Sequence, residues 1–409
     1  MYHKRLLFLL LSTWWFIFQF LTVQAIESKK VAIGYFPNWL GDSYPISRIQ
    51  FDKLTHIHYA FAIMVKGAVP EWTDPQLVET QLAELVTAAH KRKTKVLISL
   101  GGWTGSISFS EMAKSPSKRK EFINWNIEHI SKYNTDGVDI DWEYPGRQGA
   151  GCNVVDPEND VKNLLTLITE LRKALNDKFG KGSKEISIAS YTEAFKTESG
   201  PSNPHLTASI GKALDRINIM TYDMNGAWNP QTGPNSPLKS ANISFISSID
   251  FWISLGVPVN KLVGGLAFYG RSTVAKGDMT KSNSIYQDQI QNNIPKGDSA
   301  DTLWQDPYCK QSPASFSGIW KFDSLLSQGL LETPIKAKAP WVRTFDKDTA
   351  TPWLFNPSTK IFISYDDPIS IEAKVNAAKR KGIGGVMVWS IDQDSNENDL
   401  LNALAKIHS

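Results

Sequence analysis

The sequence predicts an α/β fold: a closed (β/α)₈ barrel with a small α+β insertion domain after the seventh strand. Three observations favour this fold. Eight short runs rich in β-branched residues recur along the 409 residues, and amphipathic stretches lie between them. This alternation is typical of βαβ units and a parallel sheet. Eight strands in about 380 residues favour a barrel over an open sheet, and one polar stretch of roughly 70 residues interrupts the rhythm.

The elements follow in chain order. The predicted strands begin at Val31, Thr55, Lys95, Asp136, Glu185, Arg216, Leu262 and Gly384. The predicted helices include 75–91, 160–178, 244–255 and 371–381, with a last helix over 398–408. The polar stretch is too long for a structureless loop. We therefore predict an insertion domain at 272–345, and a barrel made of 29–271 and 346–409.

The N-terminus has the composition of a secretory signal. Lys4 and Arg5 precede an apolar run from Leu6 to Val23, and Val23-Gln24-Ala25 fits a small-residue cleavage site. We predict a signal peptide at 1–25, cleavage near Ala25, and an extracellular protein without stable membrane association after cleavage; retention at a cell wall is compatible with this. The apolar run exceeds the roughly 7–15 residues of a typical signal core, so an uncleaved membrane anchor is the alternative.

Composition excludes several other classes. Apolar residues make up 42 % of the chain, which argues against disorder, and the formal charge of +3 argues against nucleic acid as the main partner. We find no Cys/His cluster with metal spacing and no Gly-rich phosphate loop, so no metal or cofactor is expected. The two cysteines, Cys152 and Cys309, are either one disulfide or two buried thiols. Asn242 begins the only clear glycosylation sequon.

Four acids interrupt an otherwise apolar strand in "TDGVDIDWEYPG", Thr135 to Gly146. Strand side chains alternate, so Asp139, Asp141 and Glu143 share one face. Inside a barrel these carboxylates cannot all ionise cheaply, and the pKa of at least one is raised. Glu143 lies nearest the C-terminal end of the strand, where barrel active sites lie, which suits a general acid held protonated by the aspartates beneath it. Asp136 is off this face and is predicted to be structural.

The segment "DGVDIDWEYPG" resembles the D-x-x-D-x-D-x-E signature of glycoside hydrolase family 18, the family of chitinases. Other segments resemble the family on the strands where the family has them. These are "SLGGW" at 99–103, "MTYDMNGAW" at 220–228, "FYGR" ending at Arg271, and "GGVMVWS" with Trp389. The resemblance runs from about Val31 to the C-terminus. It implies that the insertion is the α+β insertion domain of the family.

The resemblance implies a retaining, substrate-assisted hydrolysis of the β-1,4 bonds between N-acetylglucosamine units. Glu143 would protonate the glycosidic oxygen while the 2-acetamido oxygen of the substrate attacks, forming an oxazolinium ion. Asp141 would orient the acetamido group, and Asp139 would hold Asp141 and share a proton with it. Tyr222 and Asp223 match the pair that grips the reacting sugar.

The resemblance also implies a set of substrate contacts. Trp389 matches the floor under the reacting sugar, and Met220 would also pack beneath the reacting sugar. Trp103 and Trp228 match stacking positions on the leaving-group side. Tyr35 and Ser99 match residues that interact with the buried aspartates. The remaining predicted contacts are Arg271, Trp39, Phe61 and Gly102. The expected partner is chitin or its oligosaccharides, bound by a monomer.

Three rival functions are the alternatives. A chitin-binding lectin would keep the barrel and lose catalysis, but here every acid of the signature is intact. An endo-β-N-acetylglucosaminidase acting on N-glycans would share the acids, although the insertion and the 14 tryptophans favour a linear chitin chain. An unrelated binding or structural role does not explain the set of motifs. The insertion is expected to deepen the cleft and so to favour exo-type cleavage that releases chitobiose.

Overall fold

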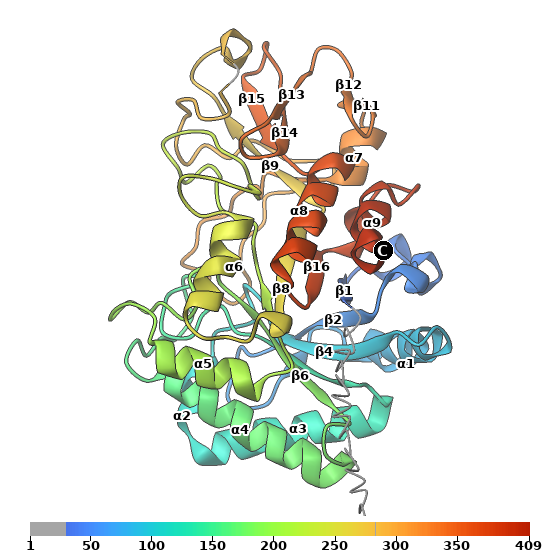
Figure 1. Cartoon of the computed structure of the whole chain (residues 1–409), viewed down its shortest axis with the longest axis vertical. Helices are drawn as coiled ribbons and strands as arrows, with labels where there is room; N and C mark the ends of the chain where they lie inside the picture. The colour runs from blue at the N-terminus through green and yellow to red at the C-terminus, as the bar shows by residue number, and fades with distance from the viewer. Residues whose placement is uncertain (1–29, 283) are drawn as a thin grey trace, which may run out of the picture.

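The computed structural model describes residues 30–282 and 284–409; the predicted signal peptide lies outside them. Eight parallel strands follow the order β1-β16-β8-β7-β6-β5-β4-β2, and pairing between β1 and β2 closes the barrel (Figure 1). Each strand begins within one residue of its predicted position. The barrel strands are β1 (Val31–Pro37), β2 (His56–Ile63), β4 (Lys95–Gly101), β5 (Gly137–Asp141), β6 (Glu185–Ser190), β7 (Arg216–Ile219), β8 (Leu262–Ala267) and β16 (Gly385–Trp389).

Helices surround the barrel, and α3 and α4 lie side by side along the lower edge of Figure 1. The barrel helices are α1 (Pro75–Lys91), α2 (Phe109–Lys114), α3 (Pro116–Tyr133), α4 (Asp160–Phe179), α5 (Pro204–Ala213), α6 (Phe245–Ser254), α8 (Pro368–Lys381) and α9 (Asp399–Leu404). The helix predicted at 371–381 begins three residues earlier, because Asp367 caps it and Pro368 occupies its first turn. The last predicted helix is shorter than 398–408 and ends in a 3₁₀ turn at Ala405–His408.

The alternation along the strands separates two cores. Outward-facing residues of β5 and its end, such as Val138, Ile140 and Trp142, belong to the large apolar cluster that contains the helices. A smaller cluster that includes Ile33, Tyr35 and Met387 fills the barrel interior. Asp139 and Asp141 alternate with the outward set, and the hydrogen bond from Tyr35 to Asp139 places that carboxylate inside the barrel.

A second, antiparallel sheet stands at the C-terminal side of the barrel, in the order β10-β9-β15-β14-β13. Its strands are β9 (Tyr269–Val274), β10 (Ile319–Lys321), β13 (Val342–Asp346), β14 (Thr351–Phe355) and β15 (Ile361–Ser364); helix α7 (Phe322–Ser327) and the short strands β11 (Leu331–Thr333) and β12 (Lys336–Ala337) accompany them. A short strand β3 (Glu71–Trp72) extends the barrel sheet beside β2.

The strands of this sheet extend beyond the predicted insertion at 272–345 at both ends of that range. The predicted boundaries fall inside β9 and β13, and the sheet extends to Ser364. The predicted barrel segment 346–409 therefore includes β14 and β15, which belong to the antiparallel sheet. A buried apolar strand has the same composition in either sheet. Among the described residues, no helix has the length and apolar character needed to cross a membrane.

Candidate active site

The three inward-facing acids of β5 lie at the C-terminal end of the barrel. Asp139 lies within the strand, Asp141 ends it, and Glu143 follows two residues later. Their exposed fractions rise in the same order, from 0 % through 4 % to 8 %. The column therefore begins in the dry barrel interior and ends where solvent and a ligand can reach it.

Asp139 is held by a shell of polar side chains from neighbouring strands. Its Oδ2 accepts hydrogen bonds from Tyr35 Oη at 2.9 Å and Ser99 Oγ at 2.7 Å, its Oδ1 accepts them from Ser187 Oγ at 2.6 Å and Asn218 Nδ2 at 3.3 Å, and His58 Nδ1 lies 3.2 Å from Oδ2. Ser99 and Ser187 are the direct cross-strand partners of Asp139 on β4 and β6, so the register of the sheet builds this shell.

The pKa values of the two aspartates move in opposite directions. Burial alone would raise the pKa of Asp139, but the charge of His58 and hydrogen bonds from His58, Ser187 and Ser99 outweigh it and leave the pKa below its usual value. Burial, followed by the charges of Glu143 and Asp139, raises the pKa of Asp141 well above its usual value. These opposite shifts favour Asp141 over Asp139 as the protonated member of the pair.

Glu143 carries the acid nearest the mouth. Burial raises the pKa of its carboxyl to about 7; a hydrogen bond with Tyr144 opposes this shift, and the charge of Asp223 adds to it. Burial is therefore the largest cause of this shift. The like charges of Glu143 and Asp141 also disfavour ionisation of both acids together, and the prediction that the aspartates keep Glu143 protonated stays a prediction. A carboxyl that titrates near neutrality can donate a proton and take it back.

Tyr222 and Asp223 follow β7 and face the insertion sheet. Asp223 Oδ1 accepts hydrogen bonds from Tyr269 Oη at 2.7 Å and from Arg271 Nε at 2.6 Å, both on β9. Asp223 has a φ of +58°, which is uncommon outside glycine, and its backbone N–H donates to Asn235 Oδ1. Arg271 therefore reaches the site as a partner of Asp223, in addition to its predicted contact with sugar hydroxyls.

Aromatic rings form a floor between the strand ends. The rings of Phe61 and Trp389 stack with centroids 5.5 Å apart and planes 14° from parallel. Trp39 stands 6.3 Å from each of them. A Cβ atom at Gly102, where φ is +82°, would come within 2.8 Å of the Phe61 ring, so a glycine there is required for the ring to occupy its place.

A cleft of about 770 Å³ opens over this floor. The predicted residues that line it are Tyr35, Trp39, Phe61, Trp103, Asp141, Glu143, Met220, Tyr222, Asp223, Trp228, Arg271 and Trp389. Asp139, Ser99 and Gly102 are not in the cleft lining; the first two are fully buried, and Gly102 lies beside the Phe61 ring. Asp136 lies at the opposite end of β5, where its carboxylate accepts hydrogen bonds from Val96 N and His90 Nε2.

Several lining residues carried no sequence signal that we used. They include Tyr144, Arg147, Gln148, Tyr191, Tyr269 and Tyr308. Tyr144 and Tyr269 lie inside quoted motifs, directly after Glu143 and two residues before Arg271, so their motif positions could have indicated them. The partners His58, Ser187 and Asn218 of Asp139 could have been found from strand alternation, which places polar residues on otherwise apolar inward faces.

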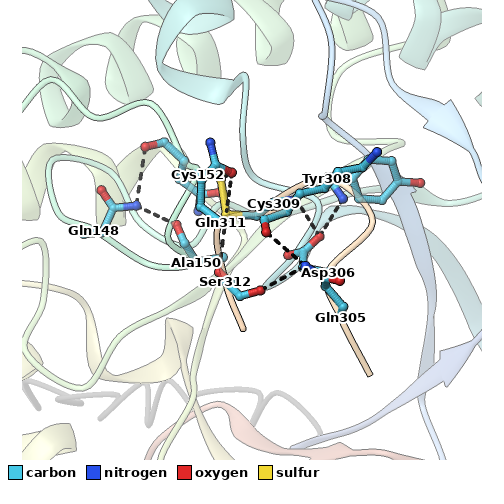
Figure 2. Close-up of a disulfide and its surroundings, with 11 residues drawn as sticks. Gln148, Ala150, Cys152, Gln305, Asp306, Tyr308, Cys309, Gln311 and Ser312 are labelled. Carbon is cyan, nitrogen blue, oxygen red and sulfur yellow. Dashed lines mark hydrogen bonds between the residues drawn. A yellow bond between two sulfur atoms is a disulfide. The ribbon is translucent and has the colours of Figure 1, made fainter. Parts of the chain in front are cut away.

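The two cysteines form a disulfide, with Cα atoms 5.5 Å apart (Figure 2). It joins the loop after Glu143 to the segment between β9 and β10. The alternative of two buried thiols is thereby excluded, and the described residues contain no free cysteine.

Buried, pKa-shifted carboxylates at the C-terminal mouth of a (β/α)₈ barrel, over an aromatic floor, define a class of sites suited to acid–base chemistry on sugars. Comparison with known proteins gives the family. The profile of glycosyl hydrolases family 18 matches residues 31–394, so the chain belongs to that family.

Individual relatives agree with this assignment. A "chitinase-like effector" of Moniliophthora roreri is 33 % identical over 91 % of this chain and 92 % of its own length. Chitinase A1 of Niallia circulans is 30 % identical over 93 % of this chain and 59 % of its own length. The crystal structure of a Rhizomucor miehei chitinase matches 93 % of this chain and all of its own, with 34 % identity and a TM-score of 0.84.

Proposed function

We propose that this protein is a chitinase that hydrolyses the β-1,4 bonds between N-acetylglucosamine units of chitin and chito-oligosaccharides. The observation that carries the proposal is Glu143, a buried carboxyl with its pKa raised to about 7, lining an aromatic cleft of about 770 Å³. Such a cleft can hold several sugar rings, whose apolar C–H faces pack on flat aromatic side chains. The chitinases among the similar proteins support this substrate class.

The proposed mechanism retains the anomeric configuration. Glu143 gives its proton to the glycosidic oxygen as the bond from that oxygen to the anomeric carbon breaks. The acetamido carbonyl oxygen of the same sugar forms a bond to the anomeric carbon, which gives an oxazolinium ion and a free leaving sugar. Water then attacks the anomeric carbon, Glu143 takes up its proton, and the acetamido group is restored.

Asp141 and Tyr222 are proposed to aim the acetamido group. Asp141 has a buried Oδ1 without a hydrogen-bond partner, and a turn of this side chain toward the cleft would let it accept the acetamido N–H. Tyr222 lines the cleft, and its hydroxyl lies 3.8 Å from Met387 Sδ, a weak acceptor that a substrate carbonyl can replace. Asp139 serves as a positioning residue. Its charge raises the pKa of Asp141, and its side chain is fully buried and does not line the cleft.

The experiment that tests the proposal is hydrolysis of a chitin tetramer by the mature protein beside Glu143→Gln, with anomer-resolved product analysis. We expect turnover to the β-anomer, and a loss of at least about 100-fold in the variant because the proton donor is gone. The matched control Glu158→Gln changes an exposed acid of the loop before α4, outside the cleft lining, and should keep full activity. Turnover to the α-anomer would exclude the retaining route.

A second candidate is a protein that binds chitin oligomers without cleaving them. The relative named a chitinase-like effector favours keeping this candidate. Binding of the tetramer without products would select it, whereas cleavage of an N-glycan in place of the tetramer would select the endo-β-N-acetylglucosaminidase alternative. The intact acids favour turnover of chitin.

The mode of cleavage and the location of the protein are further parts of the proposal. Tyr269, Arg271 and Ile319 of the antiparallel sheet, together with Tyr308, line part of the cleft, which supports exo-type release of chitobiose. Early mid-chain products from long soluble oligomers would contradict it.

We also propose that the protein is secreted as a monomer after cleavage near Ala25. Sequencing the N-terminus and measuring the mass of the extracellular protein test this; a retained Met1 in a membrane fraction would identify the anchor alternative.

A further inference from the structure

The segment between β9 and β10 folds back on itself as a hairpin, which we define as residues 301–318. Trp304 and Ser315 pair through two backbone hydrogen bonds of 3.0 and 3.1 Å. At its base, the Asp301 carboxylate accepts hydrogen bonds from the backbone N–H groups of Gly297, Ser317 and Gly318. The hairpin is therefore anchored firmly to the insertion at one end.

The tip of this hairpin, residues 305–314, carries both Tyr308 and Cys309. The Asp306 carboxylate accepts hydrogen bonds from the backbone N–H groups of Tyr308 and Cys309, at 2.8 and 3.2 Å (Figure 2). Asp306 is 6 % exposed and Cys309 only 1 % exposed, whereas Tyr308 is 39 % exposed and lines the cleft. The turn thus fixes the backbone on either side of Tyr308 and presents its ring to the cleft.

The disulfide is the tie between this tip and the barrel. Among residues 30–282 and 284–409, the side chains and backbone of the tip form hydrogen bonds only within the hairpin. The one polar contact between the tip and the barrel joins Gln311 Oε1 and Cys152 Sγ. This contact is not a hydrogen bond, because a disulfide sulfur carries no hydrogen. The bond from Cys309 to Cys152 therefore determines where the tip rests.

Cys152 belongs to a loop that is itself fixed to the acid. Asn153 Nδ2 donates a hydrogen bond of 2.8 Å to the backbone carbonyl of Glu143, and Gln148 Nε2 donates one of 2.5 Å to Ala150 O. Gln148 also lines the cleft. Glu143, the Cys152 loop and the hairpin tip therefore form one connected wall, with Tyr308 at its insertion side.

We propose that Tyr308 is a sugar-binding residue of the cleft, and that the Cys152–Cys309 disulfide is the positioning device that holds it there. The ligand is a β-1,4-linked N-acetylglucosamine chain; its ring face would pack on the Tyr308 ring, and a hydroxyl or acetamido group could reach Gln148. The inference rests on the proposed function for its substrate class. It adds a binding position that depends on a covalent tie between the hairpin tip and the loop after Glu143.

The test measures binding of chitin dimer and hexamer by titration calorimetry in the Glu143→Gln background, where the ligand persists. Tyr308→Ala should weaken hexamer binding about ten-fold, and dimer binding less, because an outlying contact is engaged only by a long chain. Tyr308→Phe should keep most of the affinity, since it keeps the ring. Trp304→Ala, which removes an exposed aromatic of the same hairpin outside the cleft lining, should bind as the parent does.

The role of the disulfide is separated by a double-mutant cycle. Cys152→Ser/Cys309→Ser should weaken hexamer binding to about the same extent as Tyr308→Ala, and combining the two changes should cost no more than either alone. Equal hexamer affinity of Tyr308→Ala and its parent would overturn the binding role. Independent, additive losses would overturn the positioning role.

These outcomes stay distinct from the fate of the proposed function. If the protein with Glu143 intact hydrolyses the tetramer but Tyr308→Ala has no effect on the hexamer, the chitinase proposal stands and this inference fails. If hexamer binding depends on Tyr308 while no hydrolysis occurs, the inference stands and catalysis fails. Thermal unfolding of each variant reports separately whether the fold survives.

Discussion

The acid strength of Glu143 is set by its surroundings, and pH therefore tests its role. Its pKa is raised to about 7, first by burial and then by the charge of Asp223. A general acid acts in its protonated form, so kcat/KM should fall as pH rises through about 7, about ten-fold for each further pH unit. A pH–rate profile on the tetramer checks this; a flat profile up to pH 9 would contradict it.

The variant Asp223→Asn tests the pKa of Glu143 through a neighbouring residue. Removing the Asp223 charge removes a cause that raises the pKa of Glu143 and leaves the Arg271 cation unpaired beside the site. Both effects lower the pKa of Glu143, so the alkaline limb should move to lower pH whatever happens to the maximal rate. Arg271→Gln, which leaves the Asp223 charge without its partner, should move the limb in the opposite direction.

Individual site residues differ in whether the sequence could predict them. The acid column, Tyr222 and Trp389 were predictable because short motifs contain them. His58, Ser187 and Asn218 were not predicted, because three separate strands bring them around Asp139. Of these, His58 and Ser187 lower the pKa of Asp139. Tyr308 has no motif and reaches the cleft through a disulfide whose existence the sequence left open.

At the scale of elements, the strand starts and most helices were predictable because hydrophobic periodicity and local caps are encoded nearby. Helix 75–91 begins and ends as predicted, since Asp74 accepts a hydrogen bond from Leu77 N and Pro75 occupies the first turn. The extent of the antiparallel sheet was not predictable, because which sheet an apolar strand joins depends on long-range pairing. β14 and β15 illustrate this limit.

The start of β5 offers a prediction at this scale. The Asp136 carboxylate accepts hydrogen bonds of 2.8 Å from Val96 N on β4 and from His90 Nε2 on α1, so it ties a strand to its neighbour and to a helix. Asp136→Ala leaves a strand N–H unpaired and should lower the free energy of unfolding by roughly 1–3 kcal/mol. Urea denaturation measures this loss.

Activity gives the control for that variant. Asp136 lies at the end of β5 opposite the cleft, so kcat/KM on the tetramer should stay near the parent value at a temperature where the variant is folded. Asp136→Asn keeps an acceptor oxygen and should lose less stability than the alanine variant. A large drop in kcat with unchanged stability would mean that Asp136 takes part in the chemistry.

For the whole molecule, barrel and insertion share part of one large apolar core, while a smaller cluster around Trp353 and Phe362 lies within the insertion sheet. Phe322 and Leu325 of α7 belong to the same buried cluster as the barrel helices, and Phe322 N donates a hydrogen bond to Phe268 O beside β8. Lys321 Nζ pairs with Asp392 Oδ2, beyond β16, at 2.8 Å. The disulfide adds a covalent link on the cleft side. An insertion attached in this way should unfold together with the barrel.

We therefore expect a single cooperative transition in guanidinium chloride, coincident by tryptophan fluorescence and far-ultraviolet circular dichroism. Phe322→Ala, which opens a cavity where the side chain is 1 % exposed, should lower the free energy of unfolding of the whole protein by about 3–5 kcal/mol. Leu303→Ala, at a side chain 65 % exposed, should change the free energy of unfolding by no more than about 0.5 kcal/mol.

Phe322→Ala could instead split the transition in two, with tryptophan fluorescence and circular dichroism lost at different denaturant concentrations. The insertion would then be a separately folding domain. The cleft wall would then depend on the disulfide far more than on the shared core.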